Sequence, residues 1–346
     1  MDTVLLLAII SVIVILLFDV TNGFHDASNM IATVVASRAM TPTQAVLLVG
    51  TFHFIGPLLG GTAVANTIGK FVDVSSLETV SSLVIILCGL GGAIFWNLLT
   101  WWLGIPSSSS HALVGGLVGA VVVAAGPEHV VWGFAQLGHG EVTGVTKVLL
   151  ALVLSPLVGF WAGFGIQRLM GFLLQGAKPS LNNRLRQVQW VSAAGLSFSH
   201  GANDAQKSMG IITMVLLLGG YITEFVVPMW VILACATMIT LGTMMGGWRI
   251  VRTVGFGIYK VRPLHAVDAQ LTSAAVIFGA SVVGAPVSTT HVVSSSIMGI
   301  GASERPKAVR WGKAQEIIST WIITIPGSAL AAVLLYGVVY LVTGLG

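Results

Sequence analysis

The sequence predicts an all-α polytopic membrane protein, and three observations lead to this fold class. Hydrophobic residues make up 55% of the 346 residues, charged residues only 8%, and the mean hydropathy is +0.94. A soluble domain carries about 25% charged residues, so a soluble fold is excluded. Long apolar runs recur, among them 45–59, 83–99 and 148–164. With their flanks these runs predict about 10–12 membrane segments. The strands of a β-barrel would instead show alternating apolar and polar residues.

The N-terminal apolar run, 4–18, is expected to be the first membrane helix. No basic residue precedes it and no A-x-A cleavage site follows it, so a signal peptide is not indicated. Cys88 and Cys235 lie inside other apolar runs and are expected to be small buried residues. The net charge of +4 indicates no nucleic-acid partner, because basic residues of membrane proteins usually mark cytoplasmic loops. The expected location is the cell (inner) membrane.

A polar motif occurs twice in this apolar chain. The segment NGFHDASNMIATVV, 22–35, resembles HGANDAQKSMGIIT, 200–213. The match places Asp26 on Asp204, an offset of 178 residues. A charged residue at membrane depth costs about 2.5–3.5 kcal/mol on insertion scales, so both aspartates are candidate functional residues.

A second motif repeats in the same order. The segment GIPSSSSHALVGG, 104–116, resembles GAPVSTTHVVSSS, 284–296, at an offset of 180 residues. Two motif pairs with nearly equal offsets indicate a duplicated unit. We therefore predict a first transmembrane repeat at 1–170, a short cytoplasmic linker at 171–187 and a second repeat at 188–346.

The distribution of basic residues predicts that the second repeat is inverted. Twelve of the 16 lysines and arginines fall in the stretches 168–186, 249–262 and 305–313, which the positive-inside rule places in the cytoplasm. The first-repeat counterparts of the last two stretches, 66–78 and 126–147, hold one lysine each. Equivalent loops therefore face opposite sides, as in inverted-repeat transporters. Both termini are predicted to be non-cytoplasmic.

The two Pro-Ser/Thr turns are predicted to be the tips of re-entrant hairpins. The second hairpin, 271–301, is expected to have arms of roughly 14 and 10 residues, which are too short to span a bilayer. The tips should then stop near the bilayer midplane. Backbone of this kind is tolerated there only where it is buried in protein or lines a cavity.

Each tip is a candidate anion site. A helix that starts after Pro106 or Pro286 directs unpaired N–H groups and the positive end of its dipole at the tip. Hydroxyl groups add neutral donors, as at phosphate sites on helix N-termini. His111 and His291 close the turns and are expected to have a structural role. The predicted anion ligands are Ser107, Ser108, Ser109, Ser110, Ser288, Thr289, Thr290 and Gln206.

The two aspartate motifs are candidate cation sites. Gly23 and Gly201 precede the aspartates and are expected to allow a break in each helix. Carboxylate, amide and hydroxyl oxygens suit a hard monovalent cation such as Na⁺. Two such cations would offset the charge of an anion held between the tips. The predicted Na⁺ ligands are Asp26, Asn22, Ser28 and Asn29 in the first repeat, and Asp204 and Asn203 in the second.

Two further charged residues lie near these motifs. Lys207 stands where the first repeat has Asn29, and it could contact the anion, pair with Asp204 or extend to the membrane surface. Asp19 has no acidic counterpart, since Ser197 occupies the equivalent position, and it ranks behind the repeated aspartates.

At these motifs the sequence resembles the inorganic phosphate transporter (PiT) family over essentially the whole chain. The family signature is a duplicated G-x-N-D-type motif, which GFHDASN and GANDAQK match. The resemblance implies phosphate symport driven by Na⁺ or H⁺, a homodimer, and no catalytic residue or resident cofactor. It assigns the coupling ions to Asp26 and Asp204 and phosphate to the hydroxyls of the two tips. His25 departs from the motif, and with Lys207 it indicates that the two cation sites differ.

The leading hypothesis is Na⁺-coupled phosphate import by alternating access. Alternatives of the same class are H⁺ coupling, a metal–phosphate substrate and sulfate transport, because sulfate also accepts neutral donors. A channel is a further alternative, although a closed anion cage favours occlusion over open conduction. The most distant alternative is an intramembrane aspartyl protease with Asp26 and Asp204 as its acid–base pair. It leaves the paired Ser/Thr turns unexplained.

Overall fold

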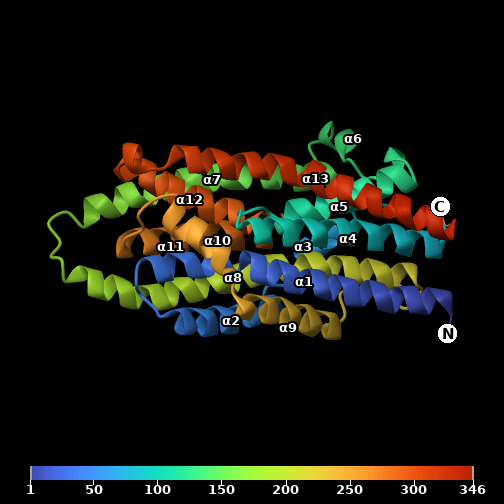
Figure 1. Cartoon of the computed structure of the whole chain (residues 1–346), viewed down its shortest axis with the longest axis horizontal. Coiled ribbons are helices and arrows are strands. Elements are labelled where there is room, and N and C mark those ends of the chain that lie inside the picture. Colours follow the sequence, from blue (N-terminus) through green and yellow to red (C-terminus); the bar gives the residue numbers. More distant parts are fainter. Residues whose placement is uncertain (1, 345–346) are drawn as a thin grey trace.

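The computed structural model describes residues 2–344, and its regular secondary structure is helical apart from an isolated bridge between Val72 and Val130. The helices pack into an elongated bundle with both chain ends at one end (Figure 1). The helices are α1 (Thr3–Ala36), α2 (Pro42–Leu59), α3 (Ala63–Ile68), α4 (Thr79–Leu103), α5 (Ser109–Ala124), α6 (Phe134–Leu137), α7 (Gly144–Leu173), α8 (Leu181–Leu218), α9 (Met229–Met245), α10 (Trp248–Arg252), α11 (Pro263–Val282), α12 (Thr289–Glu304) and α13 (Trp311–Thr343). Two short 3₁₀ helices are η1 (Pro127–His129) and η3 (Pro306–Ala308), and η2 (Thr253–Gly257) is a short π-helix.

Several of these helices are suited to a bilayer. Five of the described helices, α1, α2, α4, α7 and α13, are long and apolar enough to span it. The pair formed by α9 and 248–257 passes the same criterion together, with a bend of 60° at its break. α8 has 38 residues but carries a polar motif in its middle and basic residues at its start. The prediction of an all-α membrane protein is confirmed.

Matching motifs lie on matching elements. α1 and α8 carry the aspartate motifs, and α5 and α12 begin at the Ser/Thr turns. The short helices η1 and η3 match as well. Trp132 Nε1 donates to Pro127 O of η1 at 2.8 Å, and Trp311 Nε1 donates to Pro306 O of η3 at 2.9 Å. In Figure 1 α1 starts beside the chain ends, whereas α8 starts at the opposite end. These antiparallel directions are what an inverted repeat requires; the full inversion stays a prediction.

Each half of the chain packs mainly against the other half. α1 packs on α9, α2 on α8, α5 on α13 and α7 on α12. α7 ends at Leu173 and α8 begins at Leu181, so the connection between the halves is 174–180, inside the linker predicted at 171–187. The apolar core is therefore shared between the halves, and the contact faces are complementary.

The glycines of the aspartate motifs have a different role from the predicted one. α1 and α8 are continuous helices through Gly23 and Gly201, so the prediction of a break there is wrong. A Cβ on Gly23 would lie 2.1 Å from Ile239 O of α9, and one on Gly201 would lie 2.4 Å from His53 O of α2. Both residues are glycine because neighbouring backbones approach closely, as small residues allow between membrane helices. The broken helix is instead the bent α9–α10 pair.

The hairpins approach one another from opposite ends of the bundle, α4 and α5 from the end with the termini and α11 and α12 from the linker end (Figure 1). The prediction of second-hairpin arms of about 14 and 10 residues is wrong. α11 has 20 residues and α12 has 16. The apolar run is shorter than helix α11 because the first turns of this helix contain buried polar side chains, including His265, Asp268 and Gln270.

A cluster of polar side chains joins the outer ends of α11 and α12. Glu304 accepts hydrogen bonds from Arg262 and from the Tyr259 hydroxyl, the latter at 2.7 Å, and lies 2.8 Å from His265 Nε2. Partial burial opposes ionisation of Glu304, but the hydrogen bonds from Arg262 and Tyr259 outweigh it and lower its pKa. A carboxylate with a lowered pKa stabilises the fold above its ordinary pKa, and this contribution is lost as the pH falls through the folded-state value. The cluster therefore holds the base of the second hairpin at neutral pH.

Gly201→Ala is expected to destabilise the protein by about 1–3 kcal/mol, the usual cost of overpacking. The new methyl group would meet the His53 carbonyl, and backbone cannot turn aside as a flexible side chain can. The measurement is thermal unfolding of the detergent-solubilised chain. Gly195→Ala on the same helix is the matched control, because nothing lies within 4 Å of its Cβ position. Equal melting temperatures for both variants would contradict the close packing of α2 on α8.

Candidate functional site

The two tips meet in the interior of the bundle and begin in the same way. Ser108 Oγ accepts a hydrogen bond from His111 N at 3.2 Å, and Ser288 Oγ accepts one from His291 N at 3.3 Å. Both serines are thus helix caps, which is a different use from the anion contact predicted for them. The first two backbone N–H groups of α5 and of α12 have no helical carbonyl acceptor one turn earlier. They are therefore suited to hydrogen-bond an anion.

Asp26 of the first repeat accepts hydrogen bonds from the tip of the second hairpin. Thr289 Oγ1 donates to Asp26 Oδ2 at 3.3 Å, and Thr290 Oγ1 donates to Asp26 Oδ1 at 3.1 Å. Asn29 Nδ2 donates to Thr290 Oγ1 at 2.9 Å. The predicted cation ligands and the predicted anion ligands therefore contact each other directly.

Asp204 of the second repeat holds the tip of the first through Lys207. The Lys207 ammonium lies 2.6 Å from Asp204 Oδ1 and donates to Ser110 Oγ at 2.5 Å and to Val287 O at 3.2 Å. Its side chain is only 1% exposed. Of the three roles considered for Lys207, the structure shows pairing with Asp204. Asn22 Nδ2 also donates to Asp204 Oδ2, at 3.5 Å.

His200 lies between the two carboxylates. Its Nε2 is 4.0 Å from Asp26 Oδ2 and 3.8 Å from Asp204 Oδ2. One ligand atom from each of the three residues lies within 4.8 Å of the others, close enough to hold a metal ion together. The sequence predicted two separate cation sites, whereas the structure joins the carboxylates in one buried cluster. His200 was missed, although its position four residues before Asp204 places both on one helix face.

A second histidine connects the first tip to Asp26. His25 Nδ1 lies 2.8 Å from Asp26 Oδ1, and His25 Nε2 lies 3.1 Å from Ser107 Oγ. Thr100 on α4 completes this group, with its hydroxyl 2.8 Å from that of Ser107. Ser107 is therefore at the site, bonded to side chains of α1 and α4. Thr100 carried no signal in the sequence, while His25 was marked by its departure from the repeated motif.

Gln206, a predicted anion ligand, uses its amide in hydrogen bonds to backbone groups. Its Oε1 accepts a hydrogen bond from Val64 N at 2.7 Å, and its Nε2 donates to Ala202 O at 2.5 Å. The amide therefore caps the start of the short helix α3. This use could not be foreseen, because α3 is close to α8 only in the folded chain.

Several predicted ligands keep an unpaired oxygen. The buried Oδ1 atoms of Asn22, Asn29 and Asn203, and the buried hydroxyl of Ser109, have no hydrogen-bond partner in the described residues. Buried polar oxygens normally have a partner, and carbonyl oxygens are ligands that hard cations prefer. By contrast the Ser28 hydroxyl donates to His25 O of its own helix at 3.2 Å.

The cluster holds more carboxyl groups than cationic groups. Asp26, Asp204 and Lys207 are at most 2% exposed. Asp19, ranked lower from the sequence, is also fully buried and accepts a hydrogen bond from Ser208. Buried charges require partners, so co-bound cations would stabilise this arrangement.

Comparison with known proteins agrees with this chemistry. A family model described as "Phosphate transporter family" matches residues 22–332. A Bacillus subtilis protein named "Probable low-affinity inorganic phosphate transporter" is 47% identical, over 97% of this chain and 98% of that protein. A Rhizobium meliloti protein of the same name is 43% identical over 93% of each. The Escherichia coli "Low-affinity inorganic phosphate transporter PitB" is 26% identical over 97% of this chain and 96% of its own.

A solved structure has the same fold. The structure titled "The sodium-dependent phosphate transporter" aligns with 97% of this chain and 99% of its own, with a TM-score of 0.86 and 24% identity. At this identity the likeness establishes the fold.

Proposed function

Because the chain belongs to the phosphate transporter family, we propose that it imports inorganic phosphate together with Na⁺ by alternating access. Transport, and not catalysis, is the activity of this family, so the aspartyl protease alternative is dropped. The observation that carries the coupling proposal is the direct contact between Asp26 and the hydroxyls of Thr289 and Thr290.

This contact supplies a physical mechanism for coupling. The Asp26 carboxylate accepts hydrogen bonds from the Thr289 and Thr290 hydroxyls of the second tip. An anion bound at that tip would compete with the carboxylate for these two donors. A Na⁺ held by Asp26, with the unpaired oxygens of Asn22 and Asn29 available nearby on α1, would satisfy the carboxylate. The threonine hydroxyls could then turn to phosphate. Cation binding would therefore precede, and strengthen, phosphate binding.

The other predicted cation site would work differently. The Lys207 ammonium already lies among three oxygens, those of Asp204, Ser110 and Val287. In the first repeat the equivalent residue is the neutral Asn29. We infer that Lys207 acts as a fixed cation at Asp204, so that this half of the site needs no dissolved ion. Mobile coupling ions would then act at Asp26.

The test is uptake of labelled phosphate into proteoliposomes under an imposed Na⁺ gradient or an imposed pH gradient. Uptake that follows the Na⁺ gradient and resists sulfate competition is expected. Uptake that follows only the pH gradient would replace Na⁺ by H⁺ as coupling ion. Dependence on an added divalent cation would indicate metal–phosphate as substrate, and competition by sulfate would make the protein a broader anion permease. No uptake under either gradient would contradict the proposal.

Ser109→Ala is expected to raise the phosphate concentration for half-maximal uptake by roughly fivefold, the effect of losing one neutral hydrogen bond. The Ser109 hydroxyl is buried at the first tip and has no partner among residues 2–344, so it is available to the substrate. The measurement is the phosphate dose response of uptake. Ser155→Ala on α7 is the control, because that hydroxyl bonds its own helix at Leu152 O. An unchanged dose response would remove Ser109 from the anion site.

The orientation and the homodimer remain proposals. With the basic stretches on the cytoplasmic side, a cysteine at Ser180 should react with an impermeant maleimide only from the cytoplasm. A cysteine at His139, which is also exposed, should react only from outside. The native Cys88 and Cys235 are buried and should give a low background. Reaction of both positions from one side would overturn the predicted topology.

A further inference from the structure

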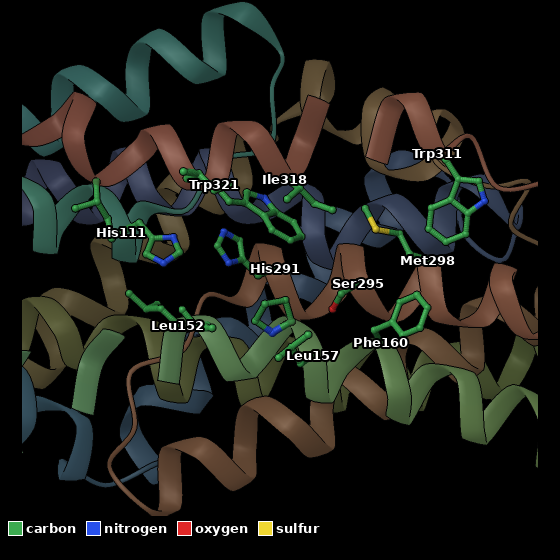
Figure 2. Close-up of a pocket in the computed structure, with 14 residues that line it drawn as sticks. His111, Leu152, Leu157, Phe160, His291, Ser295, Met298, Trp311, Ile318 and Trp321 are labelled. Carbon is green, nitrogen blue, oxygen red and sulfur yellow. The ribbon is translucent and has the colours of Figure 1, made fainter. Parts of the chain in front are cut away.

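An elongated apolar cavity lies between α7, α12 and α13, outside the ion and anion cluster (Figure 2). Its volume is about 460 Å³, within the usual range for ligand sites. Its walls include Leu157, Phe160, Met298, Ile318 and Trp321. The inner end reaches His111 and His291, whose rings lie 4.5 Å apart directly behind the two tips.

Most of the wall offers hydrocarbon contacts. At the inner end, Nδ1 of His111 and both ring nitrogens of His291 are buried and have no hydrogen-bond partner in the described residues, and the His291 ring stacks on Trp321 at 3.9 Å. The Ser295 hydroxyl donates to Val292 O of its own helix at 3.1 Å. Along the rest of its length the lining is mainly aliphatic and aromatic, so an apolar chain fits the cavity better than a polar head group, which would lose its own hydrogen bonds.

The cavity is long and faces the bilayer. On α13 it extends from Trp311 to Ile325, which at 1.5 Å per residue is about 21 Å. This length exceeds half of the roughly 30 Å hydrocarbon layer. Ile322 and Val153 flank the opening and are 72% and 60% exposed. The lateral opening lets an acyl chain enter from the surrounding lipid.

The outer end of the cavity lies next to a basic loop. Trp311, the lining residue at this end, directly follows the segment 305–310, which contains Arg305, Lys307 and Arg310. Within the described chain these three residues form no ion pair with a carboxylate. The matching segment of the first repeat, 127–132, contains Glu128 and no lysine or arginine, so the turn itself does not need positive charge.

We propose that this cavity binds an anionic phospholipid of the bilayer. One acyl chain lies along α13 from Trp311 to Trp321, and the head-group phosphate lies on Arg305 and Lys307. Basic residues beside a membrane helix favour such head groups. His291 directly follows Thr289 and Thr290, so a bound chain packs behind the second tip and supports its position. The binding step does not depend on the proposed ion coupling.

The experiment exposes the full-length chain to phosphatidylcholine vesicles with or without phosphatidylglycerol, recovers it in detergent and counts bound lipids by native mass spectrometry. The wild-type chain should retain phosphatidylglycerol in preference to phosphatidylcholine. Val153→Trp with Leu157→Trp should obstruct the cavity, and Arg305→Gln with Lys307→Gln should remove the head-group contacts. Each pair should lower retained phosphatidylglycerol roughly tenfold.

Two matched controls separate this site from general membrane attraction. Leu330→Trp adds a tryptophan to an exposed part of α13 outside the cavity, and Lys178→Gln with Arg184→Gln removes two charges from other exposed positions. Both controls should retain phosphatidylglycerol like the wild type. Equal loss in the controls, or equal retention in all variants, would overturn the proposal. So would a change of oligomeric mass in the cavity variant without lipid loss, since a second copy would then occupy the groove.

The variant Arg305→Gln with Lys307→Gln also tests the proposal if the double tryptophan variant has a folding defect. Arg305 and Lys307 are exposed, so their substitution leaves the packing intact. If the double tryptophan variant does not fold, unchanged lipid retention by the head-group pair alone overturns the proposal.

Discussion

Asp26→Asn is expected to abolish Na⁺-driven phosphate uptake, with a loss of about a hundredfold or more. The amide keeps the shape of the side chain but removes the charge that would hold a cation. It also places a donor against the hydroxyls of Thr289 and Thr290, where the carboxylate accepted both. The measurement is the initial rate of labelled-phosphate uptake into proteoliposomes at fixed Na⁺ gradient.

The control for Asp26→Asn is a carboxylate outside the cluster. Asp73 lies in an exposed loop and accepts a hydrogen bond from the Ser75 hydroxyl at 2.6 Å. Asp73→Asn should therefore leave uptake unchanged. The melting temperature of Asp26→Asn should stay near that of the wild type, which excludes misfolding as the cause. Normal uptake by a folded Asp26→Asn protein would remove Asp26 from the coupling site.

Lys207→Asn is expected to make the protein depend on Na⁺ for stability. Removing one partner of a buried ion pair leaves the other uncompensated, at a cost of about 3–5 kcal/mol. Asp204 would lose its ammonium, and the new side chain would match Asn29 of the first repeat. A dissolved Na⁺ should then take the place of the ammonium and restore stability. The measurement is the melting temperature as a function of Na⁺ concentration, for the variant and the wild type.

A double variant distinguishes this explanation from a general packing defect. Lys207→Asn with Asp204→Asn removes the uncompensated charge, so its melting temperature should lose the added Na⁺ dependence. If Lys207→Asn melts like the wild type at every Na⁺ concentration, the ammonium is not a substitute for a coupling ion. In uptake assays the single variant should also show a steeper dependence on Na⁺ concentration than the wild type.

The sequence was sufficient to predict the fold class and which motifs converge. Apolar runs predict membrane helices because hydrocarbon leaves backbone groups no partner outside a helix. A charged residue at membrane depth is costly, so the repeated aspartates indicate functional positions. On this ground Asp26 and Asp204 were predicted to hold two cations, and the two tips were predicted to hold an anion between them.

The details that sequence reasoning missed depend on contacts between distant segments. Gly23 and Gly201 indicated flexibility locally, but their role is set by the backbones of α9 and α2. Gln206 carried donors suited to an anion, but its amide is used by the start of α3. His200 shares a helix face with Asp204, but it comes close to Asp26 only because α1 and α8 are in contact. Apart from Asp204, which is four residues from His200, these partners lie far away in the sequence.

Helices from the two halves of the chain pack together in mixed groups. α4 and α5 pack with α13, α7 packs with α12, and α1 and α2 pack with α8 and α9. A movement that keeps one of these groups intact therefore displaces helices from both halves of the chain at once. Neither half could form any of these groups alone, because each group needs helices from the other half.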